Sequence, residues 1–147
     1  MLAAYPGYPR RRALIAIGSD AMFGAPTWAF ADAYSAHAAT YAYRFDHTTW
    51  TLRALGLGAT HGSEIVHVQH SYGSYPGRKL HPLGRHVQPS VGRMQRTWLD
   101  FATDEQPHPD WPCYDVPRRA TRVIGTARDV TVDDPDAVRR AAWAGLY

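Results

Sequence analysis

The chain is organised around one stretch, Gly58-Ala59-Thr60-His61-Gly62-Ser63-Glu64-Ile65, which places a histidine in a turn flanked by glycine. A carboxylate, Glu64, follows the histidine by three residues. A histidine held in this way suits a general base, because the unperturbed pKa of imidazole lies near working pH. Taken alone, the stretch fits a surface histidine in a loop even better, so the residues on either side decide between the two interpretations.

Length and composition describe one ordinary globular domain. The chain has 147 residues, 45% of them hydrophobic and 20% charged, with a net charge of +3 at pH 7; this is long enough to bury a core. The single cysteine, Cys113, excludes an intrachain disulfide and favours a reducing, cytoplasmic compartment. No apolar run reaches the length of a membrane span. Basic residues are scattered in small groups rather than gathered in one stripe, which argues against nucleic-acid binding.

Hydrophobic periodicity and turn residues predict the order of the elements. We expect helices over residues 13–18, ending at Gly18 before a short turn, and about 27–37, beginning near Pro26; a strand over 39–45; a loop over 46–57; a helix over 86–103; extended segments at 121–126 and 129–132; and a terminal helix opened by Asp133-Asp134-Pro135. Residues 69–84 and 104–119 are rich in glycine or proline and are expected to form surface loops.

Three predicted helices have an apolar stripe at helical spacing, which predicts the face that each one buries. In the helix over 27–37 the stripe consists of Trp28, Ala31, Tyr34 (or Ser35) and Ala38. In the helix over 86–103 the stripe consists of Val87, Val91, Met94, Trp98 and Phe101. In the terminal helix it consists of Val138, Ala142 and Leu146. Core packing is the interpretation that we adopt for all three stripes.

Five motifs occur along the chain in the order in which one enzyme family has them. They are Ser19-Asp20-Ala21-Met22-Phe23 with Pro26; Tyr41-Ala42-Tyr43-Arg44-Phe45-Asp46; Ala59-Thr60-His61-Gly62-Ser63-Glu64-Ile65; Trp98-Leu99-Asp100-Phe101-Ala102 followed by Trp111-Pro112 and Tyr114; and Asp134-Pro135 with Arg139-Arg140 and Trp143. Through these motifs nearly the whole chain resembles the C-terminal third of a type B carboxylesterase, an α/β-hydrolase of the cholinesterase-like branch. The resemblance implies an α/β fold, with a few strands flanked by helices over residues 13–147, preceded by a connector over 1–12, and incomplete as an isolated domain.

The same resemblance implies a role for each candidate site residue. His61 matches the general base of the family's Ser-His-Glu/Asp triad, and Gly62, Glu64 and Asp20 are expected to support the site, Asp20 by pairing with Arg139 or Arg140. The nucleophilic serine on Gly-x-Ser-x-Gly, the acidic triad member and the oxyanion hole lie upstream in the family, and this chain contains no Gly-x-Ser-x-Gly. The chain alone is therefore expected to be inactive, and to act on a small-molecule ester only when an N-terminal part completes it. No cofactor or metal is expected.

Other interpretations stay open at this point. The chain could be a non-catalytic remnant, or a fragment that depends on a partner and associates through the exposed strand edge over 39–45. A small metal-binding protein would use His61, Glu64, His67 and His70, although their spacing matches no established zinc signature. Where the family usually has an aromatic-rich run after the histidine motif, residues 66–73 are more polar. The sequence leaves open whether Met1 begins the protein or lies within a longer chain.

Overall fold

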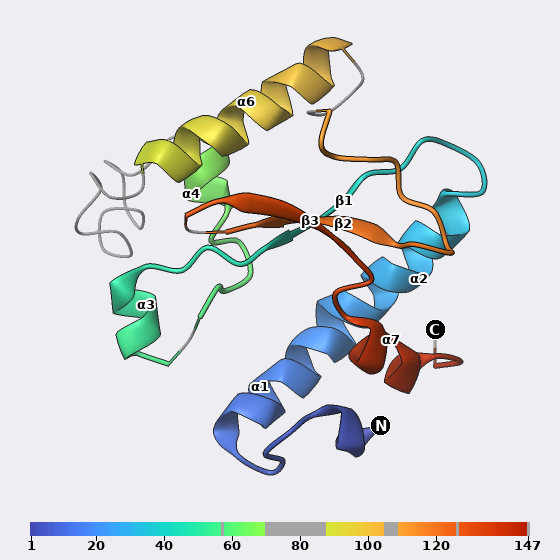
Figure 1. Ribbon diagram of the computed structural model, residues 1–147. Helices are drawn as coiled ribbons and strands as arrows, with labels where there is room; N and C mark the ends of the chain where they lie inside the picture. Colours follow the sequence, from blue (N-terminus) through green and yellow to red (C-terminus); the bar gives the residue numbers. More distant parts are fainter. Residues whose placement is uncertain (57, 70–87, 105–108, 126, 147) are drawn as a thin grey trace. The chain divides into compact units, whose positions relative to one another are not determined.

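The computed structural model describes residues 1–56, 58–69, 88–104, 109–125 and 127–146 (Figure 1). The chain divides into two compact units, each assembled from segments that are distant in sequence. Unit 1 comprises Met1–Ala42, Cys113–Ala120 and Asp133–Tyr147, and unit 2 comprises Tyr43–Pro112 and Thr121–Val132. A three-stranded sheet accompanied by helices confirms the predicted α/β class.

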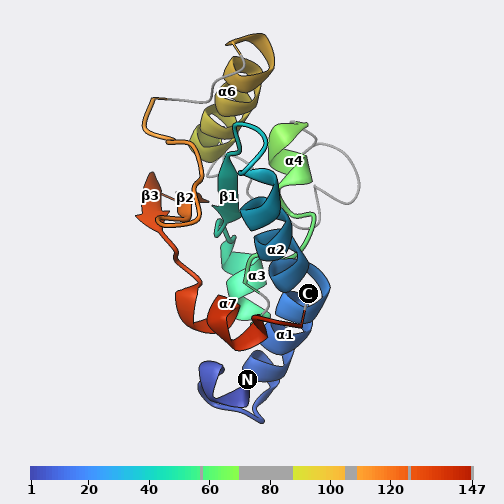
Figure 2. The same ribbon diagram turned by 90° about the vertical axis from the view of Figure 1, so that its right-hand side faces the viewer.

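The longest segment of regular structure in unit 1 is one uninterrupted helical run. Helix α1 (Arg11–Ser19) continues through the π-helical turn η2 (Asp20–Gly24) into α2 (Ala25–Tyr34), and Figures 1 and 2 show α1 and α2 following each other along one line. The predicted helix end at Gly18 is therefore wrong. One glycine inside a helix costs only about 1 kcal/mol, and burial of the face that includes Ala13, Asp20 and Ala25 offsets this cost. Pro26 lies in the first turn of α2, as expected. Trp28 and Ala31 of its predicted stripe are half-buried, but Tyr34 is 46% exposed, so the far end of that stripe is wrong.

The C-terminal helix α7 (Ala137–Trp143) contacts α2 and the short N-terminal helix η1 (Leu2–Ala4). Its predicted buried stripe is wrong, because Val138 is 70% exposed and Leu146 is 62% exposed. Ala142 of that stripe is half-buried, together with three residues that the stripe did not include: Arg139, Arg140 and Trp143. Ion pairs and hydrogen bonds of these residues, rather than aliphatic packing, fix the face that the helix turns inward.

The sheet has the order β1-β2-β3, formed by β1 (Ala42–Phe45), β2 (Ala120–Ile124) and β3 (Asp129–Asp133). The carboxyl ends of β1 and β2 meet, since the Asp46 N–H donates to the Ile124 carbonyl at 3.0 Å, so these two strands run parallel. A short loop joins β2 to β3, which are therefore antiparallel. The sheet confirms all three predicted extended segments, and β1 lies at one end of its order.

In unit 2 the long helix α6 (Gln88–Asp104) confirms the predicted helix over 86–103. Met94 is buried as predicted, but Phe101 is 49% exposed, so the far end of the predicted stripe is wrong. Trp98 meets Tyr43 of β1 edge-on, with ring centroids 4.9 Å apart, and stacks on Trp111 at 6.0 Å. The predicted stripe residues Val87 and Val91 lie outside the residues whose side chains the structure describes.

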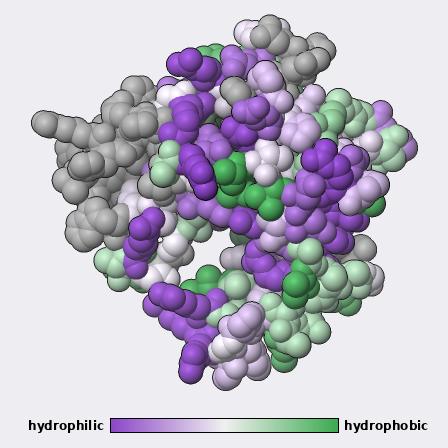
Figure 3. Space-filling model, viewed as in Figure 1, coloured by the Kyte–Doolittle hydropathy of each residue, from purple (hydrophilic) through white to green (hydrophobic). Residues whose placement is uncertain are grey.

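Two short helices complete unit 2: α3 (Trp50–Ala54) and α4 (Ile65–Val68). Helix α3 contradicts the loop predicted over residues 46–57. Most of the surface loop predicted over 69–84 lies outside the described residues. In the described parts of the chain no helix combines the length and the hydropathy needed to cross a membrane. Patches of hydrophobic residues nevertheless reach the surface among hydrophilic ones (Figure 3).

Candidate functional site

His61 lies in a tight turn that glycines bound on both sides. Gly58 has φ of 68° and Gly62 has φ of 76°, a left-handed backbone conformation that glycine adopts without steric cost. The His61 side chain is exposed. The turn therefore presents an imidazole at the surface of unit 2, which is the geometry that the sequence predicts for this stretch.

The buried residue Ser63 stabilises the turn through hydrogen bonds. It is 5% exposed, and its hydroxyl donates to the Thr60 carbonyl at 2.6 Å, beside the Ser63 N–H, which donates to the same oxygen at 3.0 Å. The Ser63 carbonyl accepts from His67 Nδ1 at 3.3 Å in the tautomer that is protonated there. The backbone on both sides of His61 is thus fixed by groups that are not exposed to solvent.

Beneath the turn lies a cluster of three rings. The His67 side chain on α4 is fully buried and His47 is 2% exposed, with ring centroids 4.6 Å apart. Phe45, the last residue of β1, meets His67 edge-on at 4.9 Å. The end of β1 and helix α4 therefore position the turn that carries His61.

The support that Ser63, His47 and His67 give to the turn is not among the predictions from the sequence. A signal was present in the polar run over 66–73, which departs from the family's aromatic pattern. The His67 ring fills a buried position beside the rings of Phe45 and His47 and adds a hydrogen-bonding nitrogen there.

Glu64 occupies the N-cap of α4, where it is half-buried. Its carbonyl accepts from the His67 N–H at 2.8 Å and from the Val68 N–H at 3.0 Å. Burial raises the pKa of the Tyr43 phenol, and the negative charge of Glu64 raises it further, which places this carboxylate near β1. Its support of His61 stays a prediction, as does that of Gly62 beyond the turn geometry.

Asp20 belongs to unit 1, where it forms the predicted ion pair with Arg139. The residue is 5% exposed, and its carboxylate accepts from the Tyr5 hydroxyl at 2.8 Å and lies 3.3 Å from Arg139 Nη1. Burial raises the pKa of Asp20, against the lowering effects of the Tyr5 hydrogen bond and the Arg139 charge. The Tyr5 hydroxyl also accepts from the Trp143 indole. Asp20 thus joins the N-terminal segment, η2 and α7, and its link to the site at His61 stays a prediction.

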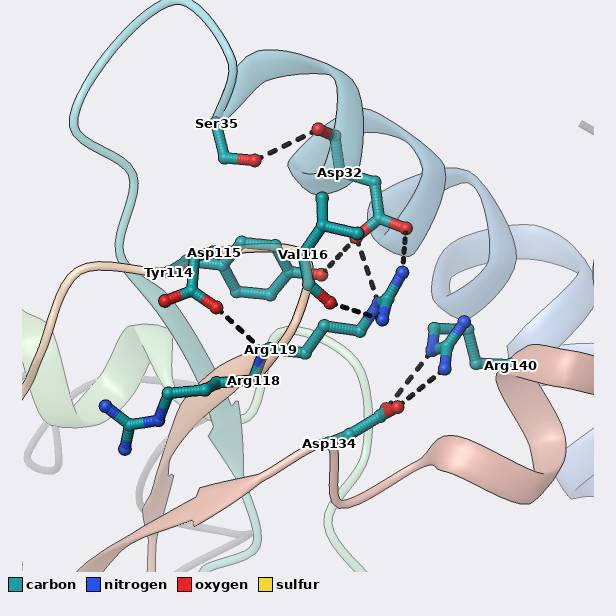
Figure 4. A network of polar contacts seen from close by, with 9 residues as sticks. All are labelled: Asp32, Ser35, Tyr114, Asp115, Val116, Arg118, Arg119, Asp134 and Arg140. Carbon is teal, nitrogen blue, oxygen red and sulfur yellow. Dashed lines mark hydrogen bonds and ion pairs between the residues drawn. The ribbon is translucent and has the colours of Figure 1, made fainter.

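A second polar network in unit 1 centres on Asp32 (Figure 4). Its carboxylate accepts from the Tyr114 hydroxyl at 2.6 Å and from Arg119 Nη2 at 2.9 Å, while Arg140 pairs with Asp134 at 2.6 Å. Burial raises the pKa of Asp32, but the hydrogen bonds from Arg119 and Tyr114 and the charge of Arg119 hold it below the ordinary value. Asp32 and Arg140 also line a cavity of about 240 Å³ between α2 and α7. Because both side chains already have charged partners, we interpret this network as structural.

The alternative metal site predicted from His61, Glu64, His67 and His70 stays a prediction, because not all four of these residues are described. His67 is enclosed in the ring cluster and His70 lies outside the described residues. Within the described ranges, no three histidine, cysteine, aspartate or glutamate side chains gather closely enough to hold a metal ion.

Comparison with known proteins gives a consistent result. The family model described as "Carboxylesterase family" matches residues 8–139. A cocaine esterase from Oryctolagus cuniculus is 34% identical over 69% of this chain, which corresponds to 20% of that protein. The carboxylesterase EST55 of Geobacillus stearothermophilus superposes with a TM-score of 0.76 and 29% identity, over 94% of this chain and 29% of that one. A PNB esterase, 24% identical with a TM-score of 0.74 over 91% of this chain and 27% of its own, shares the fold. This chain thus spans less than a third of the length of each.

Proposed function

The chain belongs to the carboxylesterase family and forms part of an α/β-hydrolase fold; on this premise we propose that it supplies the general base of a carboxylic-ester hydrolase, His61. The observation that supports the proposal is the exposed imidazole in a glycine-bounded turn, held from beneath by Ser63 and His67. This turn coincides with the histidine motif through which the sequence resembles the family.

In this role His61 takes the proton of a serine hydroxyl while the serine oxygen attacks the carbonyl carbon of the ester. The bond to the alcohol oxygen then breaks, and the imidazolium returns its proton to the departing alcohol. A water molecule, deprotonated by the same imidazole, attacks the acyl-serine and releases the carboxylic acid and the free serine. A turn whose backbone is held by hydrogen bonds suits both the formation and the hydrolysis of the acyl-serine, because the imidazole must lie within hydrogen-bonding reach of the serine and then of the water.

The serine must come from outside these 147 residues, since they contain no Gly-x-Ser-x-Gly. Loss of the nucleophile alone costs about a million-fold in rate in a well-studied serine protease, so the chain by itself is inactive toward esters in this proposal. Completed by the remainder of a carboxylesterase, it acts on a small-molecule ester. A cytoplasmic location is part of the proposal and is supported by the lone cysteine, Cys113, which is exposed and free.

Hydrolysis of a p-nitrophenyl ester by the purified chain tests the proposed dependence on completion. The His61→Ala variant is the control, because it removes the general base while changing only an exposed side chain. The proposal predicts the same slow release of p-nitrophenol from both proteins. Turnover by the unaltered chain far above that of the variant would show a complete site within these residues and would overturn the proposal of dependence.

A further inference from the structure

The cavity of about 240 Å³ between α2 and α7 is lined by four side chains that can recognise a ligand: Trp28, Asp32, Arg140 and Trp143. Its other lining residues are alanines and one glycine, whose small side chains leave the space open. All of them belong to unit 1, whereas His61 belongs to unit 2. What this cavity can bind is therefore a question separate from the proposed function.

The Arg140 guanidinium has hydrogen-bonding capacity that its ion pair does not use. Its Nε donates to one oxygen of Asp134 at 3.1 Å, and its Nη2 donates to the other at 2.6 Å. The third nitrogen, Nη1, makes no hydrogen bond to any residue in the described ranges. The pair with Asp134 holds the guanidinium in place (Figure 4), and the two N–H groups of Nη1 are left for a ligand in the cavity.

The Asp32 carboxylate has an acceptor position left in a similar way. Its Oδ1 accepts from the Tyr114 hydroxyl and from Arg119 Nε, whereas its Oδ2 accepts from Arg119 Nη2 alone among the residues that the structure describes. A carboxylate oxygen can accept two hydrogen bonds, so Oδ2 can take one more. Burial raises the pKa of Asp32, while its hydrogen bonds and the charges of Arg119 and Arg140 lower it, which indicates that Asp32 and Arg140 lie near each other.

The charges around the cavity favour a neutral ligand. Asp32 and Arg119 form one ion pair, and Arg140 and Asp134 form another, so the four charges cancel. An anion would be repelled by the Asp32 carboxylate and a cation by the Arg140 guanidinium. A neutral group that accepts a hydrogen bond at one atom and donates one at a neighbouring atom suits both side chains. A primary amide is such a group, because its carbonyl oxygen accepts and its NH2 group donates.

The two indoles supply the apolar part of the site. Trp28 and Trp143 are half-buried, and aromatic rings prefer aromatic partners in stacked or edge-to-face geometry. Drug-sized ligands occupy pockets of about 300–1,000 Å³, so the smaller volume here suits a molecule with a single ring. We propose that this cavity binds a small neutral aromatic amide. The amide oxygen accepts from Arg140 Nη1, the NH2 group donates to Asp32 Oδ2, and the ring contacts Trp28 and Trp143.

Titration of benzamide into the purified chain tests the proposal, with the NMR signals of the Trp28 and Trp143 indole N–H groups as the measure of binding. The test variant is Ala29→Leu, which fills the cavity from α2 without removing a charged group. The matched control is Ala33→Leu, the same change at another exposed residue of α2 that does not line the cavity. Benzoate and benzamidine have the same ring but carry a negative and a positive charge, so they test the choice of a neutral ligand.

The proposal predicts that benzamide shifts both indole N–H signals in the unaltered chain and, with equal affinity, in Ala33→Leu. Binding should weaken about tenfold or more in Ala29→Leu, and the unaltered chain should bind benzoate and benzamidine about tenfold or more weakly than benzamide. Both variants should keep the unfolding midpoint of the unaltered chain, because both alanines are exposed.

Two results on the protein side would overturn the proposal: no shift of either indole signal in the unaltered chain, or equal benzamide affinities in Ala29→Leu and Ala33→Leu. On the ligand side, equal affinities for benzamide, benzoate and benzamidine would overturn it as well, because they would show that Asp32 and Arg140 take no part in recognition.

Discussion

Replacement of Asp32 by asparagine should lower the free energy of unfolding by roughly 2 kcal/mol at neutral pH. Asp32 accepts hydrogen bonds from the Tyr114 hydroxyl at 2.6 Å and from Arg119 Nη2 and Nε at 2.9 Å and 3.2 Å. Each hydrogen bond to a charged group contributes about 1.5–3 kcal/mol, and an asparagine oxygen retains only part of this. The Asp32 and Arg119 side chains are 29% and 18% exposed, so partial solvent screening reduces the total.

The loss should also depend on pH, with a sign that follows from the lowered pKa of Asp32. A carboxylate whose pKa is lowered by folding stabilises the protein above the pKa of the unfolded chain, and this stabilisation disappears as the pH falls through the folded value. The difference between the unaltered chain and Asp32→Asn should therefore be largest at neutral pH and shrink in acid. Urea unfolding followed by the fluorescence of the five tryptophans measures both variants.

A matched control is available in the exposed ion pair between Asp133 and Arg118. These side chains lie 3.1 Å apart but are 55% and 54% exposed, and exposed pairs contribute little to stability. Asp133→Asn should accordingly leave the unfolding midpoint almost unchanged at every pH. An equal loss in Asp32→Asn and Asp133→Asn, or a loss in Asp32→Asn that stays constant into acid, would refute the assignment of Asp32 as the centre of a stabilising network.

Two further perturbations concern η2 and the base of the turn that carries His61. Gly24→Ala should be less stable than Gly18→Ala by about 2 kcal/mol in thermal unfolding. The reason is that a Cβ added at Gly24 would lie 2.9 Å from the buried carboxylate of Asp20, whereas nothing lies within 4 Å of a Cβ added at Gly18. Equal stabilities of the two variants would contradict this packing. His67→Ala should lower the free energy of unfolding in urea by roughly 3 kcal/mol, because it empties a fully buried ring site beside Phe45. His67→Phe should recover most of this stability. If it does not, the ring nitrogen rather than the ring itself stabilises the cluster.

The elements that the sequence predicts correctly are those with a strong local pattern. Alternating aromatic residues identify β1, and apolar residues at intervals of three and four identify α6. The helix end predicted at Gly18 is wrong because helix propensity is a local property. The helix continues past Gly18 because the face that includes Ala13, Asp20 and Ala25 is buried. The buried stripe predicted for α7 is wrong for a similar reason. The orientation of α7 follows from the contact between Arg139 and Asp20, which are 119 residues apart, and no pattern within α7 itself specifies Asp20 as the partner.

The candidate site was predictable in part for the same physical reason. The turn around His61 is local, and its glycines signal the left-handed backbone that the structure shows. The support beneath it is not local, since His67 meets Phe45 and His47 from another segment. A histidine is ordinarily read as polar or metal-ligating, so its burial among rings becomes visible only in three dimensions.

The most direct test of the central claim is the rate of ester hydrolysis by a completed enzyme with and without His61. This chain, joined in one polypeptide to the part of the Geobacillus stearothermophilus carboxylesterase that it does not match, would be compared with its His61→Ala variant on a p-nitrophenyl ester. If His61 is the general base, the unaltered fusion is active and the variant loses about a million-fold in kcat, with an unchanged unfolding midpoint. An active fusion whose rate survives His61→Ala would contradict the account.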